Sequence, residues 1–285
     1  MPLTYMLFPG GKRKALTLSY DDGVEQDVRL MEIMNAHGLK GTFNLNSGLY
    51  AKEGIKYPEG QIHRRMTRSQ ADALYAGSGQ EVALHAYEHA DLTGLPSSAA
   101  AWQIMKDKEE LEKQFGRIVR GFAYPYGAFD DRTVETLRGC GIAYARTVIS
   151  THAFGLPKDW LRLEATCHHN DPELMTLARK FREETPYGNP WLFYLWGHSY
   201  EFEQYDNWQV IEEFAAYLGG RTDVWYAANI EIYDYVQAWR HLIFSADGRQ
   251  VYNPTAQTLF ILSDEKEFQI GSGQRIRTET SVESR

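Results

Sequence analysis

The chain contains little cysteine: only Cys140 and Cys167 occur among its 285 residues, and they do not form a C-x-x-C pair. Neither a disulfide framework nor a cysteine metal site is therefore indicated. The sequence also lacks an apolar run long enough to span a bilayer, and it lacks the basic and apolar segments of a signal peptide at its start. We expect a cytoplasmic protein without a membrane partner, although a signal peptide that had already been removed would leave the same pattern.

Basic residues are outnumbered by acidic ones. The chain has 30 Lys and Arg against 38 Asp and Glu, which gives a formal net charge of -8. This balance argues against nucleic acid as a partner, because binding to phosphates needs an excess of positive charge. A hydrophobic content of 43% over this length is enough to bury one large core.

Strand-like and helix-like segments alternate along most of the chain, which is typical of a parallel α/β fold. Val28, Met31 and Met34 form a helical stripe that Gly38 can end, and residues 39–45 follow as a strand. Asn207 and Asn229 are expected to cap two later helices.

Two polar segments stand directly behind short apolar runs. Residues 19–23, Ser-Tyr-Asp-Asp-Gly, follow the run 15–18, and residues 85–89, His-Ala-Tyr-Glu-His, follow the run 81–84. The same arrangement recurs at residues 125–127, Pro-Tyr-Gly, and at His198. Because the carboxyl ends of parallel strands share one face, all four segments are expected to meet in a single site.

Two imidazoles and a carboxylate suggest a metal centre. His85, His89 and Asp22 are the expected ligands, a set that binds zinc and leaves positions open for water and substrate. Cobalt, nickel or iron could bind the same donors. A pair of Asp residues before Gly is also common in turns and helix caps, but the histidine pair favours the metal interpretation.

These four segments resemble the motifs of the polysaccharide deacetylase family, whose NodB-type homology domain is also found in carbohydrate esterase family 4. The family's T-F-D-D-G corresponds to residues 19–23, its H-[ST]-x-x-H to His85 and His89, its P-Y-G to residues 125–127, and its final histidine to His198. The resemblance implies a distorted (β/α) barrel over residues 1–240. Residues 241–285 are expected to form a small β-rich C-terminal tail packed on or beside the barrel, because Asp247-Gly248 is a hairpin signal and residues 259–262 form an apolar strand core.

The resemblance also implies a metal-dependent hydrolase that removes N-acetyl groups from an amino sugar, an oligosaccharide or a polysaccharide. Asp21 would be the base, His198 the acid that protonates the leaving amine, and the backbone N–H of Tyr126 a donor to the oxyanion. The aromatic and ring residues that could line a substrate site are Tyr124, Pro125, Tyr200, Trp208 and His168.

The sequence departs from the family pattern at two positions. Ala123 stands where the family has an arginine that orients the base, so Arg120, Arg146 or Arg162 would have to replace it. Ala86 replaces the Ser or Thr between the two histidines.

Several other functions fit parts of the pattern. Residues 85–89 also match H-x-x-E-H, a metalloprotease signature that requires both histidines on one helix. On the family's fold, a small cyclic amide or ureide or an O-acetyl ester could be the substrate, and a catalytically silent sugar-binding protein is the non-enzymatic alternative. The expected partner is therefore a carbohydrate or small amide, and the oligomeric state stays open.

Overall fold

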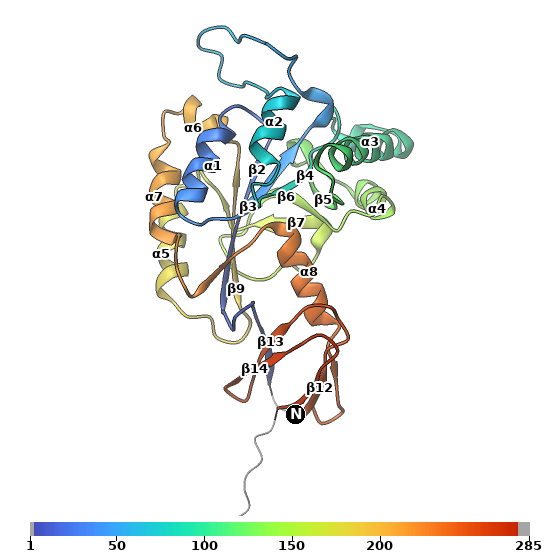
Figure 1. Cartoon of the computed structure of the whole chain (residues 1–285), viewed down its shortest axis with the longest axis vertical. Helices are drawn as coiled ribbons and strands as arrows, with labels where there is room; N and C mark the ends of the chain where they lie inside the picture. Colours follow the sequence, from blue (N-terminus) through green and yellow to red (C-terminus); the bar gives the residue numbers. More distant parts are fainter. Residues whose placement is uncertain (1–2, 279–285) are drawn as a thin grey trace, which may run out of the picture.

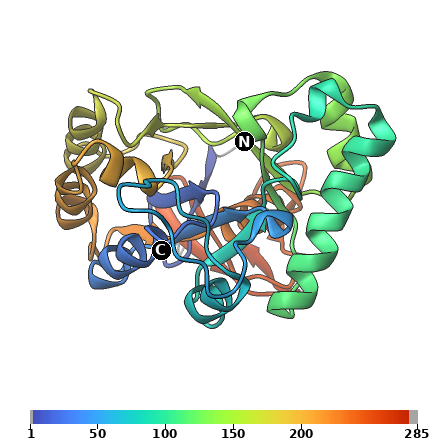
Figure 2. The same ribbon diagram turned by 90° about the horizontal axis from the view of Figure 1, so that it is seen from above.

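The computed structural model describes residues 3–278 and contains a nearly closed parallel barrel (Figures 1 and 2). The barrel strands are β2 (Lys14–Asp21), β3 (Gly41–Leu45), β4 (Glu81–Leu84), β5 (Gly121–Ala123), β6 (Tyr144–Ser150), β7 (Leu163–Ala165), β8 (Cys167–His168) and β9 (Trp191–Gly197). β7 pairs with β6 while β8 pairs with β9, and only Thr166 separates β7 from β8, so this one stretch of chain joins the two ends of the sheet. A further strand, β10 (Val224–Tyr226), pairs with the first residues of β2.

In the view from above, helices lie to the left of the barrel, to its right and below it, while strands and loops border the upper side (Figure 2). No helix within residues 3–278 combines the length and the apolar character needed to cross a membrane. The α-helices are α1 (Asp27–Ala36), α2 (Arg68–Tyr75), α3 (Ser97–Phe115), α4 (Asp131–Gly139), α5 (Leu174–Glu183), α6 (Tyr200–Gln204), α7 (Gln209–Leu218) and α8 (Asn229–Arg240), and the short 3₁₀ turns are η1 (Ser47–Leu49), η2 (Leu92–Gly94), η3 (Pro125–Gly127) and η4 (Trp160–Arg162).

The two sides of the barrel strands have different chemistry. On β2, Leu16, Leu18 and Tyr20 belong to the large core shared with the helices. Their neighbours alternate to the other side, where the hydroxyl of Thr17 donates to Asn229 and the hydroxyl of Ser19 accepts from Asn44. The barrel interior is therefore a polar network, and Asp21 lies at its carboxyl end.

The predicted helix from Val28 to Met34 and the strand after Gly38 are confirmed, but the two predicted asparagine caps are wrong. Trp208 occupies the cap position of α7, and Ala228 that of α8. Asn229 lies one residue inside α8, where its buried amide accepts from Thr17 and donates to the hydroxyl of Tyr194. The Asn229 side chain, which was expected to cap α8, therefore forms hydrogen bonds inside the barrel instead.

A β appendage lies below the barrel in Figure 1, on the side away from the carboxyl ends of the strands. It includes the N-terminal strand β1 (Thr4–Leu7), which pairs antiparallel with β13 (Leu259–Ser263), and β13 pairs with β14 (Lys266–Ile270). A second small sheet contains β11 (Ile243–Phe244), β12 (Gln250–Tyr252) and β15 (Arg275–Arg277). The β-rich tail expected for residues 241–285 thus shares its sheet with the start of the chain, and its residues 279–285 lie outside the described part.

Candidate active site

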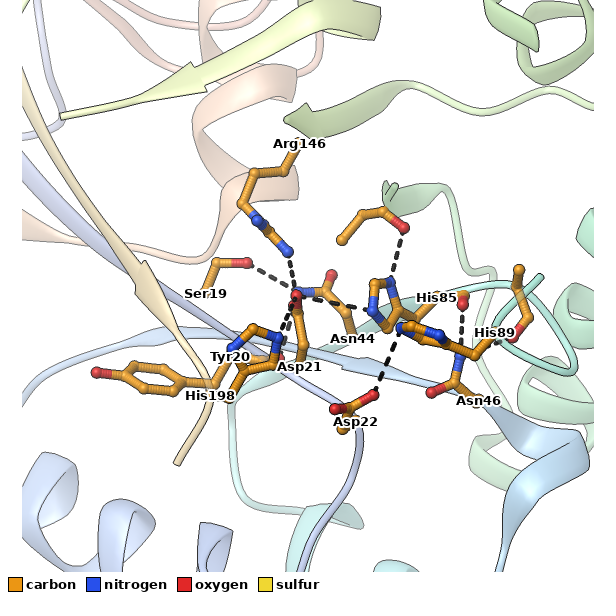
Figure 3. Close-up of polar contacts among 12 residues, drawn as sticks. Ser19, Tyr20, Asp21, Asp22, Asn44, Asn46, His85, His89, Arg146 and His198 are labelled. Atoms are coloured by element: carbon orange, nitrogen blue, oxygen red, sulfur yellow. Dashed lines mark hydrogen bonds and ion pairs between the residues drawn. The ribbon is translucent and has the colours of Figure 1, made fainter. Parts of the chain in front are cut away.

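Asp21 is the last residue of β2, and its carboxylate is held on both oxygens (Figure 3). The amide of Asn44 donates to Oδ1 over 2.8 Å, and the guanidinium of Arg146 donates to Oδ2. Burial alone would raise the pKa of Asp21, but Arg146, with His85 and His198, holds that pKa below its ordinary value. The carboxylate is therefore kept ionised although its residue is only 2% exposed.

Arg146 takes the place expected for the missing family arginine. It stands on β6 directly beside Ala123 of β5 in the sheet register, so the small alanine leaves room for a guanidinium from the neighbouring strand. Its guanidinium lies between Asp21 and the ring of Trp196, 4.4 Å from the ring centroid. The other two candidates are engaged elsewhere, since Arg120 pairs with Asp234, and Arg162 pairs with Asp131 and Asp159.

Asp22, His85 and His89 lie close enough together to hold a metal ion. His89 Nε2 is 3.8 Å from Asp22 Oδ1, and the two imidazole centroids are 4.7 Å apart. His85 Nδ1 donates to the carbonyl of Ala123 over 2.8 Å, which leaves the lone pair on Nε2 free for a cation. Burial lowers the pKa of His89 to about 4, so both the tautomer of His85 and the charge of His89 fit a metal centre.

The backbone around these ligands is unusual. Asp22, Ala86, His89 and Tyr126 all have positive φ angles, of 85°, 62°, 54° and 59°. Residues without glycine's freedom adopt this conformation at a cost, and such residues concentrate at functional sites. Residues 85–89 consequently form no helix, which excludes the metalloprotease interpretation of H-x-x-E-H.

Two residues at this site were not expected from the sequence, and both come from the segment between η1 and α2. Arg65 donates to Asp22 Oδ1 over 2.9 Å and to the amide oxygen of Asn46 over 2.6 Å. His63 Nε2 lies 3.2 Å from Asp22 Oδ2. The segment between η1 and α2 contains no sequence motif. Its approach to Asp22 depends on tertiary contacts, so no signal in the sequence predicts His63 or Arg65 at this site.

His198 follows β9 and faces Asp21 from the other side of the carboxylate (Figure 3). Its Nε2 is 3.8 Å from Asp21 Oδ2, and its Nδ1 is 3.5 Å from Glu201 Oε2. Burial would lower the pKa of His198, but Glu201 and then Asp21 raise it above its ordinary value. The site therefore contains an ionised carboxylate and an imidazole that favours its protonated form.

The aromatic residues divide into two groups. Tyr126 is 71% exposed and packs edge-on against His89, while Tyr200 packs against both His63 and His198. Tyr124 is instead 1% exposed and donates its hydroxyl to the carbonyl of Leu161, so it has no surface for a ligand.

Three further expected substrate residues lie away from open surface or in other contacts. Pro125 is buried. Trp208 packs on Phe202 and under the guanidinium of Arg29. His168 faces Glu201, with Nε2 3.1 Å from Oε2. Tyr126 and Tyr200 are thus the aromatic side chains that the structure places beside the proposed metal and acid residues.

The fold and the site define a class of protein: a parallel β/α barrel with an Asp-His-His cluster, a buried second Asp and a histidine at the carboxyl ends of its strands. Residues 9–145 match the family model described as polysaccharide deacetylase.

Solved structures support the fold. A Mycobacterium smegmatis protein of the polysaccharide deacetylase type is similar over 84% of this chain and 96% of its own length, with 17% identity and a TM-score of 0.56. The Xyl-CE4 domain of a multidomain xylanase, from the hindgut metagenome of Trinervitermes trinervoides, is similar over 79% of this chain and 92% of that domain, with 15% identity and a TM-score of 0.50.

A further match is with the Streptococcus pyogenes deacetylase PplD in complex with acetate, at 19% identity and a TM-score of 0.45. It covers 51% of this chain, and the chain spans 61% of the length of that protein. No curated protein matches the sequence.

Proposed function

We propose that this protein is a metal-dependent deacetylase that removes N-acetyl groups from an amino sugar or an oligosaccharide or polysaccharide. The observation that carries the proposal is the position of the Asp22, His85 and His89 cluster beside Asp21, with His198 facing the same carboxylate. The match of residues 9–145 to the polysaccharide deacetylase family supports the removal of acetyl groups in general. The amide substrate, the metal and the residue roles are our inferences.

The three ligands would hold the metal through Asp22 and the imidazoles of His85 and His89. A divalent ion bound there, zinc in the first instance and otherwise cobalt, nickel or iron, would lower the pKa of a bound water to about 7 and polarise the acetyl carbonyl. Asp22 is prepared for this role because His63 and Arg65 hold its pKa well below its ordinary value, despite its burial.

Asp21 would act as the general base. Its carboxylate takes a proton from the attacking water while the water oxygen adds to the carbonyl carbon. Arg146 and Asn44 fix the carboxylate on its two oxygens, so it stays ionised and oriented before each turnover. A backbone N–H at Tyr126 would donate to the oxyanion, and one such donor is commonly worth about 3 kcal/mol.

His198 would act as the general acid on the other side of the carbonyl. The bond between the carbonyl carbon and nitrogen breaks, its electron pair goes to nitrogen, and that nitrogen takes the proton of His198 Nε2. Acetate and a free amine are the products. Tyr126 and Tyr200 flank this position and offer their rings to the apolar face of a pyranose.

The test combines metal content with product release. Purified wild type, Asp22→Ala and His85→Ala are analysed by mass spectrometry for bound metal and are assayed for acetate from N-acetylglucosamine oligomers. We expect close to one metal per chain in the wild type, loss of metal in both variants, and acetate only from the wild type. A wild type that binds no metal under replete conditions would contradict the mechanism.

Two substrate panels test which kind of bond the protein hydrolyses. O-acetylated xylan oligomers test the ester alternative, and small cyclic amides and ureides test the alternative substrate on the same fold. Acetate from the ester alone, or opening of a cyclic amide alone, would overturn the N-acetyl assignment. Metal binding without hydrolysis of any of these substrates would instead support the silent sugar-binding alternative.

A further inference from the structure

A second polar cluster lies behind His198, around the carboxylate of Glu201 on α6. His168 Nε2 and His169 Nε2 are each 3.1 Å from Glu201 Oε2, and His198 Nδ1 is 3.5 Å from the same oxygen. The backbone N–H of His198 donates to that oxygen as well, over 3.2 Å. His169 is fully buried, and the Glu201 side chain is 17% exposed. One carboxylate oxygen thus faces three imidazoles inside the protein.

The hydrogen bonds of His168 show how the cluster is protonated. The backbone N–H of Asn170 donates to His168 Nδ1 over 3.1 Å, so this nitrogen carries the lone pair. The hydrogen of neutral His168 is consequently on Nε2, the atom that faces Glu201. His168, His198 and Glu201 are close enough for a metal ion, but an Nε2 that carries hydrogen cannot be a ligand. The cluster is therefore organised around an ionised carboxylate.

Glu201 lies beside the nitrogen of His198 that faces away from Asp21. A carboxylate beside Nδ1 stabilises a hydrogen on that atom, and this fixes the ring with Nε2 toward Asp21, 3.8 Å from Oδ2. His169 also packs against the helix that carries Glu201, because its ring stacks on Phe202 of α6, with the two centroids 4.1 Å apart.

We infer that Glu201 is a positioning residue: its carboxylate, held by His168 and His169, fixes His198 with hydrogen on Nδ1 and with Nε2 directed toward the scissile amide nitrogen. The inference rests on the proposed function and adds to it the group that orients the acid. The family motifs in this sequence include no residue for this role, and Glu201 lies three positions after the final motif histidine.

The consequence depends on the leaving group. When an amide is cleaved, the nitrogen must gain the Nε2 proton as the bond between carbon and nitrogen breaks, while the Nδ1 hydrogen stays beside Glu201. An aryl ester releases a stable phenolate that needs no proton. Loss of Glu201 therefore impairs amide cleavage selectively, whereas damage to the metal cluster or to Asp21 impairs both reactions.

The test compares two substrates in the Glu201→Gln variant. Acetate release is measured from N-acetylglucosamine oligomers, and 4-nitrophenolate release from 4-nitrophenyl acetate. We expect the amide rate to fall roughly 10- to 100-fold and the ester rate to change less than about threefold, since no general acid acts there. Glu203→Gln is the matched control, because Glu203 lies on the same helix but pairs with Arg64 and Gln26. Its ratio of amide to ester rates should equal that of the wild type.

A second readout does not depend on turnover. Nitrogen-15 NMR of histidine-labelled protein, recorded at a pH high enough to leave His198 neutral, reports which of its ring nitrogens carries the single remaining hydrogen, with His198→Gln used for assignment. We expect hydrogen on Nδ1 in the wild type and a mixture of tautomers in Glu201→Gln. The wild type could be inactive on all acetylated substrates while Glu201→Gln still changes the tautomer of His198. This result would refute the proposed function and support the positioning role.

Three outcomes would overturn the inference. The first is an equal loss of amide and ester hydrolysis in Glu201→Gln, which would show a merely structural role. The second is an unchanged His198 tautomer in that variant. The third is a second equivalent of metal in the wild type that disappears in His168→Ala, which would make the cluster an ion site.

Discussion

At the scale of single residues, the pairing of Arg146 with Asp21 has the clearest energetic consequence. Both groups are almost fully buried, so the guanidinium and the carboxylate compensate each other's loss of hydration. The sequence could narrow the partner to three arginines, but only the sheet register identifies it, because Arg146 lies beside Ala123 on the next strand.

We predict that Arg146→Met leaves a buried carboxylate without its cation and destabilises the fold by about 3 to 5 kcal/mol. Chemical unfolding monitored by circular dichroism measures this. Arg120→Met is the matched control, since Arg120 and its partner Asp234 are partly exposed, and such surface pairs contribute about 0 to 1 kcal/mol. Equal effects of the two substitutions would contradict the importance of the buried pair.

The motif residues could be predicted from the sequence because they stand at strand ends, where a parallel sheet brings distant segments together. Asp22, His85 and His89 meet for that reason. His63 and Arg65 could not be predicted, because their segment has no periodic pattern and reaches Asp22 only through tertiary contacts. Tyr124 was misplaced for a related reason: sequence alone does not say which side of a strand end faces the core.

At the scale of the elements, Glu81 joins β4 to the start of α8. Its carboxylate accepts from the hydroxyls of Thr42 and Tyr144 and from the backbone N–H of Ile230. Burial raises the pKa of Glu81 to about 7. The alternation of strand residues predicts that an inward side chain stands here, but not that the barrel interior is polar, because the partners come from three other elements, β3, β6 and α8.

We predict a pH-dependent effect of Glu81→Gln. The pKa of Glu81 is higher in the folded state than its ordinary value, so its contribution to stability is complete below that ordinary value and is lost as the pH rises through about 7. As the pH rises from 5 to 8, the unfolding free energy of Glu81→Gln should therefore increase relative to that of the wild type by about 2 to 3 kcal/mol.

Urea unfolding of both proteins at the two pH values checks this prediction. Glu109→Gln provides the comparison, because the Glu109 side chain is 70% exposed and should show no such pH effect. A difference between Glu81→Gln and the wild type that stays constant with pH would show that Glu81 is ionised in the folded protein throughout this range.

At the scale of the whole molecule, the barrel and the appendage share a second apolar core. Tyr235 of α8 contacts Phe8 and donates its hydroxyl to the carbonyl of Leu7, while Ile261 and Ile270 of the appendage belong to the same cluster. The sequence predicted a β tail after residue 240, but it could not show that the tail takes up the N-terminal strand, because β-pairing between the chain's ends leaves no local signal.

We predict that a chain ending at Arg240 does not fold stably. Its β1 would lose the strand that pairs with it, and the apolar side of α8 would be exposed to water. In the full chain, Ile261→Ala should cost about 2 to 5 kcal/mol, whereas Phe244→Ala, at a position 39% exposed, should cost much less. Calorimetry of the three variants tests this, and a shortened chain that melts within a few degrees of the full one would contradict it.

The pairing of β1 with β13 also sets an order of events during synthesis. Thr4 lies opposite Ser263, 259 positions later, so β1 leaves the ribosome long before the strand that pairs with it. Until then the edge of β1 is open to other chains, which makes this newly synthesised strand a point of aggregation risk. All the barrel strands precede residue 227, whereas β13 begins at Leu259, so a pairing that can form only late lies at the end of the molecule away from the candidate site (Figure 1).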